Sequence, residues 1–232
     1  MNVISVIVLV LSAAALAFGF WASYCISSGI YLKAVCRFDT EKKIIALTFD
    51  DGPCAKYTPG ILDLLGQYGI EAAFFCIGSK IEGNEHILKR MADHGHLIGI
   101  HSYRHDWRFT LSGKRRITED LTTCADKIKS ATGFEPTLFR PPFGVTNPDI
   151  ASAVKKLNLR TIGWSIRSFD TVKTPGKVIK RVTKRLKPGS IILLHDNREN
   201  TVHILQAIIK FAMENGYKFA RSHKYIDLNN FQ

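Results

Sequence analysis

The stretch IALTFDDGPC, residues 45–54, ends an apolar run with two adjacent carboxylates and a turn. Ile44–Phe49 has the composition of a buried strand. Asp50 and Asp51 follow it directly, although aspartate is depleted in strands and neighbouring negative charges repel each other. Asp-Gly-Pro is strong turn chemistry, so the pair has a purely structural explanation. The other explanation is a functional site at the end of the strand.

Short apolar runs alternate with segments of helical periodicity from Ile44 onward. The expected strands are residues 44–49, 72–78, 96–101, 137–140, 159–165, 190–195 and 217–221. The expected helices are residues 58–69, 84–95, 114–133, 147–157, 175–186 and 201–216. Apolar strands separated by helices indicate an α/β fold with a parallel sheet covered by helices. About seven strands fit either a closed or nearly closed barrel or an open doubly wound sheet.

Polar residues recur where these strands end. They are Asp50–Asp51, His101, Arg140, Asp170 and His195–Asp196. In parallel α/β folds, sites are built at the carboxyl ends of the strands. We therefore expect these side chains to converge on one mouth.

Two of these residues belong to a metal-binding pattern. In HSYRH, His101 and His105 are four residues apart, so both can face one side of a helical turn and bind one metal ion. Asp50 or Asp51 would complete a His₂Asp set, which is the ligand number of a catalytic zinc with an open position. The other carboxylate would remain free as a general base. Surface or hydrogen-bonded histidines are the alternative explanation.

Two further motifs place charged groups at strand ends. Arg140 precedes two prolines in FRPPFG, where it can pair with a base carboxylate or simply belong to a rigid loop. His195 follows four apolar residues in IILLHD. It can be a buried, hydrogen-bonded histidine or an acid that protonates a leaving group, with a carboxylate that favours its charged form.

In this order, the motifs TFDDG, HSYRH, RPPFG and LLHD resemble those of polysaccharide deacetylases of the NodB-homology type, carbohydrate esterase family four. The resemblance covers about residues 43 to 222. It implies a distorted (β/α) barrel, here with about seven parallel strands, and a bound divalent metal. Zn²⁺ is the expected ion, with Co²⁺, Ni²⁺ and Mn²⁺ as alternatives. Family members mostly remove N-acetyl or O-acetyl groups from chitin-like, peptidoglycan-like or xylan polymers.

The resemblance also implies a role for each site residue. Asp50 matches the catalytic base, Asp51 the metal-binding aspartate, His101 and His105 the metal histidines, Arg140 the arginine that orients the base, His195 the catalytic acid, Asp170 the carboxylate that tunes it, Phe143 the backbone N–H donor to the oxyanion, and Leu193 the wall of the acetyl pocket. One motif departs from the family pattern. In WSIRSFDT, residues 164–171, Arg167 replaces an acidic residue and Thr171 replaces a groove-lining tryptophan, so the sugar-binding groove is altered.

The expected function is metal-dependent hydrolysis of N-acetyl groups from the aminosugars of a glycan. Asp50 would take the proton of the attacking water, and His195 would protonate the departing nitrogen. Three alternatives stay open: a deformylase or deacetylase of a lipid-linked aminosugar, an O-acetyl carbohydrate esterase, and a non-catalytic glycan-binding module. A binding module would not need an acid, a base and a metal triad together.

The first 32 residues contain no charged side chain, and residues 3–24 are long enough to cross a bilayer. We expect residues 1–36 to be a membrane anchor, with a cleaved signal segment as the alternative, and residues 37–232 to be the catalytic domain. The formal net charge of +12 suggests an anionic partner, but the chain has no zinc-finger, RRM-like or phosphate-loop motif, so we expect no nucleic acid.

The membrane side of the domain rests on two conflicting signals. Lys33, Arg37, Lys42 and Lys43 follow the apolar segment and no charge precedes it, which favours a cytoplasmic domain. The family's polymer substrates lie outside the cell. We expect a single-pass protein of the cell membrane with its catalytic domain outside the cytoplasm.

Overall fold

The computed structural model describes residues 2–220. Its strands form one curled sheet in which every strand pairing is parallel. The strands are β1 Ala34–Val35, β2 Ile44–Asp50, β3 Ala73–Cys76, β4 Leu97–Ile100, β5 Leu138–Phe139, β6 Arg160–Ile162, β7 Ile166–Arg167, β8 Ile191–His195 and β9 Lys218–Phe219. Their spatial order is β1-β6-β5-β4-β3-β2-β8-β7, and β9 pairs with the start of β2.

The connection between β6 and β7 shows why the sheet must curl. These strands lie near opposite ends of the strand order, yet only residues 163–165 separate them. Four Cα–Cα steps from Ile162 to Ile166 span at most about 14 Å, so the two edges must approach each other. The chain after β1 also crosses this gap, because the Phe38 N–H donates a hydrogen bond to the Gly189 carbonyl (2.9 Å). A curled half-barrel is therefore confirmed, and the open doubly wound sheet is wrong.

Most of the expected strands and helices are present, with three differences in the strands. The strand expected at residues 159–165 ends at Ile162, and Gly163, which follows it, packs directly on the Cys36 sulfur. β1 and β7 were not expected from the sequence. The strand expected at residues 217–221 is β9, and Arg221 lies outside the described residues.

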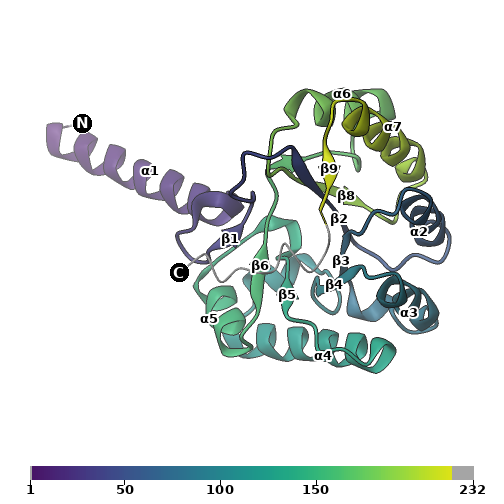
Figure 1. Cartoon of the computed structure of the whole chain (residues 1–232). Helices are drawn as coiled ribbons and strands as arrows, with labels where there is room; N and C mark the ends of the chain where they lie inside the picture. Colours follow the sequence, from purple (N-terminus) through teal and green to yellow (C-terminus); the bar gives the residue numbers. More distant parts are fainter. Residues whose placement is uncertain (1, 221–232) are drawn as a thin grey trace.

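Six helices, α2 to α7, cover the outer face of the sheet (Figure 1). The helices of the chain are α1 Val3–Tyr24, α2 Thr58–Gln67, α3 Glu85–Asp93, α4 Lys114–Thr132, α5 Pro148–Lys156, α6 Pro175–Arg185 and α7 Thr201–Glu214. Proline stands in the first turn of α2, α5 and α6, where its missing N–H is not needed. Asn147 caps α5 by accepting a hydrogen bond from the Ile150 N–H (2.8 Å).

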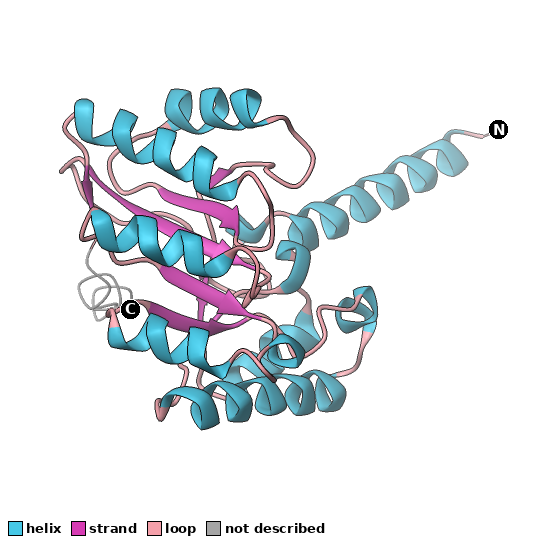
Figure 2. Cartoon of the chain, turned by 90° about the vertical axis from the view of Figure 1, so that its right-hand side faces the viewer, coloured by secondary structure: helices cyan, strands magenta, loops and turns pink. Residues whose placement is uncertain are grey.

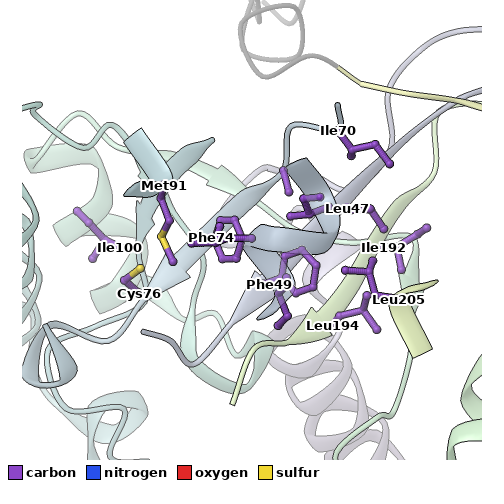
Figure 3. Packing of buried hydrophobic residues seen from close by; sticks show 14 of the residues in the cluster. Leu47, Phe49, Ile70, Phe74, Cys76, Met91, Ile100, Ile192, Leu194 and Leu205 are labelled. Atoms are coloured by element: carbon purple, nitrogen blue, oxygen red, sulfur yellow. The ribbon is translucent and has the colours of Figure 1, made fainter. Parts of the chain in front are cut away.

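The two faces of the sheet bury different side chains, because successive residues of a strand point to opposite faces. The outward residues pack against the helices, as Figure 3 shows for Phe49 on β2, Phe74 on β3 and Leu194 on β8. The inward residues form a smaller cluster of Phe75, Leu138, Ile162 and Ile191. The inward face is therefore apolar where this cluster lies, and its charged residues lie at the strand ends.

α1 projects away from the body of the protein (Figure 1), and Ala22 is its buried residue. The helix has 22 residues, and its most apolar 18-residue stretch has a mean hydropathy of 2.7, so it is long and apolar enough to cross a membrane, as a signal sequence also would be. Its C-terminal end rests on a loop of the domain, where the Thr146 N–H donates to the Ser23 carbonyl (2.9 Å). In Figure 2, α1 leaves the domain on the side toward which the large strand arrows point.

Candidate active site

Four functional side chains occupy the last inward-facing position of their strands. Asp50 ends β2 and His195 ends β8, and these residues are paired in the register of the sheet. His101 directly follows β4, and Arg140 directly follows β5. The guanidinium of Arg140 lies 4.1 Å from the ring centre of the inward residue Phe75. The parallel strands therefore bring these groups together at one mouth, as the sequence predicts.

Arg140 fixes the position of Asp50 from below. It is fully buried, and its Nη1 donates to Oδ1 of Asp50 (2.7 Å) and to the hydroxyl of Thr48 (2.8 Å). Its Nε and Nη2 donate to the carbonyls of Ile162 (3.0 Å) and Gly163 (2.8 Å). Because the guanidinium is held from several directions, it gives the Asp50 carboxylate one orientation and a charge partner.

Asp51, His101 and His105 form a triangle that could hold a metal ion. Oδ1 of Asp51 lies 3.6 Å from Nε2 of His101 and 3.5 Å from Nε2 of His105. Ligand atoms bound tetrahedrally at 2.0–2.2 Å lie about 3.3–3.6 Å apart, so both distances from Asp51 fit a metal such as zinc, and all three ligand atoms lie within 4.8 Å of one another. Oδ1 of Asp51 is also buried without a hydrogen-bond partner among the described residues, which is what a ligand atom requires.

Both histidines present the nitrogen that a metal needs. Nδ1 of His101 lies 2.8 Å from the Arg140 carbonyl, which can only accept, so Nδ1 carries the proton and Nε2 keeps its lone pair. Burial and the neighbouring His101 lower the pKa of His105 to about 4, so its imidazole is neutral near pH 7. The residues present therefore fit a divalent metal.

The expected helical turn between the two histidines is wrong. Residues 101–106 form a loop in which Ser102 (φ 68°) and His105 (φ 53°) adopt left-handed conformations. The Ser102 hydroxyl accepts a hydrogen bond from the His105 N–H (2.8 Å) and closes the loop. His101 instead continues the inward face of β4, and the loop returns His105 beside it, with ring centres 4.8 Å apart.

Backbone strain concentrates around this mouth. Six non-glycine residues of the described chain have positive φ, and Asn158 is the member remote from the site motifs. The other five are Asp51, Ser102, His105, Phe143 and Phe169. Such conformations cost about 1–3 kcal/mol each and persist where the surrounding structure enforces them, which is typical of functional sites.

His195 and Asp170 form a second polar pair at the mouth. Nδ1 of His195 lies 2.7 Å from Oδ1 of Asp170, and the His195 N–H donates to Oδ2 of the same carboxylate (2.8 Å). Ser168 donates its hydroxyl proton to Oδ1 (2.8 Å). Burial alone would lower the pKa of His195, but the hydrogen bond and charge of Asp170, with Asp50 and Asp51, raise it above its ordinary value. The imidazole can therefore carry a proton near neutral pH.

The last two predicted residues lie beside these groups. Phe143 is 44% exposed, and its ring centre lies 4.6 Å from that of His105. Leu193 is buried on β8, two residues before His195 and therefore on the same inward face. All nine predicted residues thus belong to one end of the curled sheet.

Two contacts of Asp51 were missed by sequence reasoning, those with Asn197 and Lys80. Asn197 donates its amide to Oδ2 of Asp51 (3.3 Å), and Lys80 donates to the Asp51 carbonyl (2.8 Å). Asp196 packs directly against Gly52 and accepts the hydroxyl proton of Thr58 (2.7 Å), and burial raises its pKa to about 7. The polar sequence HDN was the available signal for Asn197, because Asn197 directly follows the strand-end residues His195 and Asp196.

Comparison with known proteins agrees with this geometry. The family model "Polysaccharide deacetylase" matches residues 37–162. A peptidoglycan-N-acetylglucosamine deacetylase of Bacillus cereus is 37% identical over 185 residues, which are 77% of this chain and 86% of that protein. The peptidoglycan-N-acetylglucosamine deacetylase PgdA of Listeria monocytogenes is 33% identical over 193 residues, or 83% of this chain. The chain spans only 40% of the length of this Listeria relative.

Solved structures give the same result for the fold. The family 4 carbohydrate esterase PdaA of Bacillus subtilis superposes with a TM-score of 0.77 at 28% identity, covering 89% of this chain and 88% of that one. A CE4 family pseudoenzyme from Bacillus anthracis superposes with a TM-score of 0.76 at 26% identity, covering 82% and 68%. Because the same fold includes a pseudoenzyme, activity has to be argued from the side chains.

Proposed function

Because the chain belongs to the polysaccharide deacetylase family, a family of carbohydrate esterases, we propose that it is a metal-dependent deacetylase acting on the N-acetylated aminosugars of a peptidoglycan-like glycan. One observation carries the proposal. The Asp50–Arg140 pair, the Asp51–His101–His105 triangle and the His195–Asp170 pair share one mouth. A glycan-binding module would have no use for this combination.

Asp50 is proposed as the general base. Its orientation by Arg140 leaves Oδ2 3.8 Å from Nε2 of His101, next to the triangle. A water molecule between Asp50 and the triangle would therefore lose its proton to a carboxylate that cannot rotate away. When bound by Asp51, His101 and His105, a divalent metal would polarise the acyl carbonyl and make this water more acidic.

His195 is proposed as the general acid that protonates the departing sugar nitrogen. Its contact with Asp170 fixes the ring and supports its protonated form. The Phe143 N–H is proposed as a donor to the developing oxyanion, and Leu193 as the wall beside the acetyl methyl group. A covalent acyl-enzyme is not required, because the attacking group is water.

The test is an assay of the full chain, purified in detergent and loaded with Zn²⁺, on N-acetylglucosamine oligomers and on peptidoglycan. Acetate release that depends on added metal supports the proposal. Formate release from a lipid-linked formylated aminosugar, or acetate release only from O-acetylated xylan, would instead support one of the alternatives. Glycan binding without any acyl release, in the presence of Zn²⁺, Co²⁺, Ni²⁺ or Mn²⁺, would contradict the assignment.

Residues 1–36 are proposed as a membrane anchor and residues 37–232 as the catalytic domain, placed outside the cytoplasm. The apolar helix Val3–Tyr24 and the start of the family match at residue 37 support the boundary. Fusing alkaline phosphatase, which is active only after export, and separately a fluorescent protein active in the cytoplasm to Gln232 tests the membrane side. Bright fluorescence with an inactive phosphatase would contradict an external domain.

A further inference from the structure

An exposed basic and aromatic segment lies beside the mouth and is not used by the proposed mechanism. It comprises residues 104–116 apart from the proposed metal ligand His105, and is called here the basic loop. The short helix η3, Trp107–Leu111, forms its centre. Phe109 is buried and holds η3 on the domain, whereas Trp107 (62% exposed) and Leu111 (76% exposed) face solvent. Large apolar side chains held outward by a buried neighbour indicate a surface with a partner.

The charge of the basic loop is strongly positive. Its exposed basic side chains are Arg104, Arg108, Lys114, Arg115 and Arg116. Asp106 is its acidic residue and is engaged as the cap of η3, where it accepts the Arg108 N–H (3.0 Å). From α4, Glu119 pairs with Arg115 (2.9 Å), and from α5, Asp149 accepts the Lys114 N–H (3.1 Å). Positive charge therefore remains in excess, and it lines the same open groove as Trp107 and Leu111.

Two hydrogen bonds connect the basic loop to the end of α1. Thr146 donates to the Ser23 carbonyl at the end of α1 (2.9 Å), and the adjacent Asn147 donates to the Thr110 carbonyl of η3 (2.8 Å). Exposed Trp21 and Tyr24 lie at this end of α1. Tryptophan and tyrosine are the residues enriched at membrane interfaces. When α1 spans a membrane, its C-terminal end lies at the membrane surface, and Trp107 lies near the same surface.

The mouth of the barrel opens toward the same side. Thr146 follows the loop that carries Phe143, so α1 rests on the rim of the site itself. Figure 2 shows α1 leaving on the side to which the strand arrows point. The mouth of the site and the membrane anchor therefore lie on the same side of the domain, so the site faces the bilayer.

We propose that the basic loop docks on an anionic lipid surface, with Trp107 and Leu111 in the interface and the basic side chains at the headgroups. This orientation holds the mouth against the membrane. On the basis of the proposed function, the docked orientation limits the substrate to glycan at the bilayer surface, such as a lipid-carried aminosugar. Lys and Arg side chains are attracted to an anionic lipid surface, so several of them add appreciably to the membrane affinity of the single anchor.

Fluorescence quenching of Trp107 by nitroxide lipids tests the docking without any measurement of activity. The full chain carrying Trp21→Phe is reconstituted into phosphatidylcholine vesicles, with and without phosphatidylglycerol. The double variant Trp21→Phe/Trp107→Phe gives the signal of Trp164, and the difference isolates Trp107. We expect a lipid nitroxide near the headgroups to quench Trp107, about twofold more strongly when phosphatidylglycerol is present.

The matched control places the reporter at the other end of α4. Phe134 is also exposed (67%), but it follows the C-terminus of a 19-residue helix whose N-terminus lies in the basic loop, about 28 Å away. In the variant Trp21→Phe/Trp107→Phe/Phe134→Trp, the emission of the position 134 reporter, obtained by subtracting the Trp164 signal of the double variant, should therefore remain unquenched. Arg108→Glu with Arg116→Glu should reduce the quenching of Trp107 to the level seen without phosphatidylglycerol.

Two results would overturn the proposal. One is equal quenching, or none, at Trp107 and at the position 134 reporter. The other is a Trp107 that lipid does not quench but whose emission shifts with soluble polyphosphate, which would identify a site for soluble polyanions. Since acetate release is assayed separately, a failed docking test leaves the proposed deacetylase function standing, and a failed activity test leaves the docking standing.

Discussion

The outward and inward faces of the sheet have different properties along β2 and β8, although the same two strands contribute to both faces. Outward, Leu47, Phe49 and Leu194 are apolar along the whole strand and pack under the helices. Inward, polarity rises along β2 from Ala46 through Thr48 to Asp50, and β8 ends on His195. Each step of this rise has a partner, since Thr48 contacts Arg140 and Arg140 contacts Asp50.

The difference between the two faces separates two roles of the same strand. The outward face contributes burial, which depends on volume and tolerates chemical substitution of similar size. The inward face contributes charges at fixed positions, which depend on single atoms and tolerate little. Substitutions on the outward face should therefore change the free energy of unfolding, and substitutions at the inward strand ends should change turnover and metal binding.

The largest effect is expected at the metal triangle. His101→Ala removes one of the three proposed ligands, so bound metal should fall below one ion per chain and turnover should drop by more than about 10⁴-fold, beyond the range of a lost general base. Elemental analysis of the purified variant and acetate release measure the two quantities.

His96→Ala is the matched control, because His96 is also buried but precedes β4, whereas His101 follows it. Nδ1 of His96 accepts the Ala72 N–H (3.1 Å), so this variant should lose some stability while keeping its metal and its turnover per folded molecule. A tightly held ion in His101→Ala, one per chain, would refute the ligand assignment.

The second prediction separates the adjacent aspartates. Asp50→Asn keeps the shape of the Arg140 contact but removes the base, so turnover should fall by about 10²–10⁴-fold with metal retained. Asp51→Asn should weaken metal binding instead, because the ligand oxygen of the triangle loses its charge. Metal titration of both variants decides the matter, and equal loss of affinity would contradict this division of roles.

The position of these residues was predictable from the sequence, because parallel strands meet at one edge and the motifs stand where the strands end. Which aspartate faces the triangle was assigned by family resemblance alone. Its physical basis is the left-handed backbone of Asp51 (φ 75°), which turns the chain after β2 and directs consecutive carboxylates to different partners. Periodicity cannot reveal such a turn, and it likewise suggested a helical turn for residues 101–105.

Other features depend on contacts between distant segments. The close packing of Gly163 on Cys36, between β6 and β7, joins residues far apart in sequence. The contact of α1 with Thr146 depends on how the linker after Tyr24 folds back along β6. Nothing local in the sequence encodes either feature, so neither was predicted.

The third prediction acts on the outward face. Phe49 is fully buried and stacks on Phe74 with ring centres 5.0 Å apart, so Phe49→Ala should lower the free energy of unfolding by about 3–5 kcal/mol. Turnover per folded molecule should remain close to that of the parent, although Phe49 is adjacent to Asp50. Denaturant titration measures the free energy of unfolding. Acetate release divided by the concentration of metal-loaded sites measures turnover per folded molecule. A large loss of turnover at unchanged stability would break the comparison between the two faces.

The smallest effect is expected at Asp170, and it is a shift in pH dependence. His195 is the proposed general acid, so kcat/KM should fall as the pH rises through the pKa of His195. Burial alone would lower this pKa, but the hydrogen bond and charge of Asp170 outweigh it. Asp170→Asn keeps the shape and removes the charge, so the pKa should drop and the alkaline limb of the profile should move to lower pH. Ser168→Ala removes only a hydrogen bond to the same carboxylate (2.8 Å) and should move the limb less. An alkaline limb that stays in place in Asp170→Asn would mean that another group is the acid.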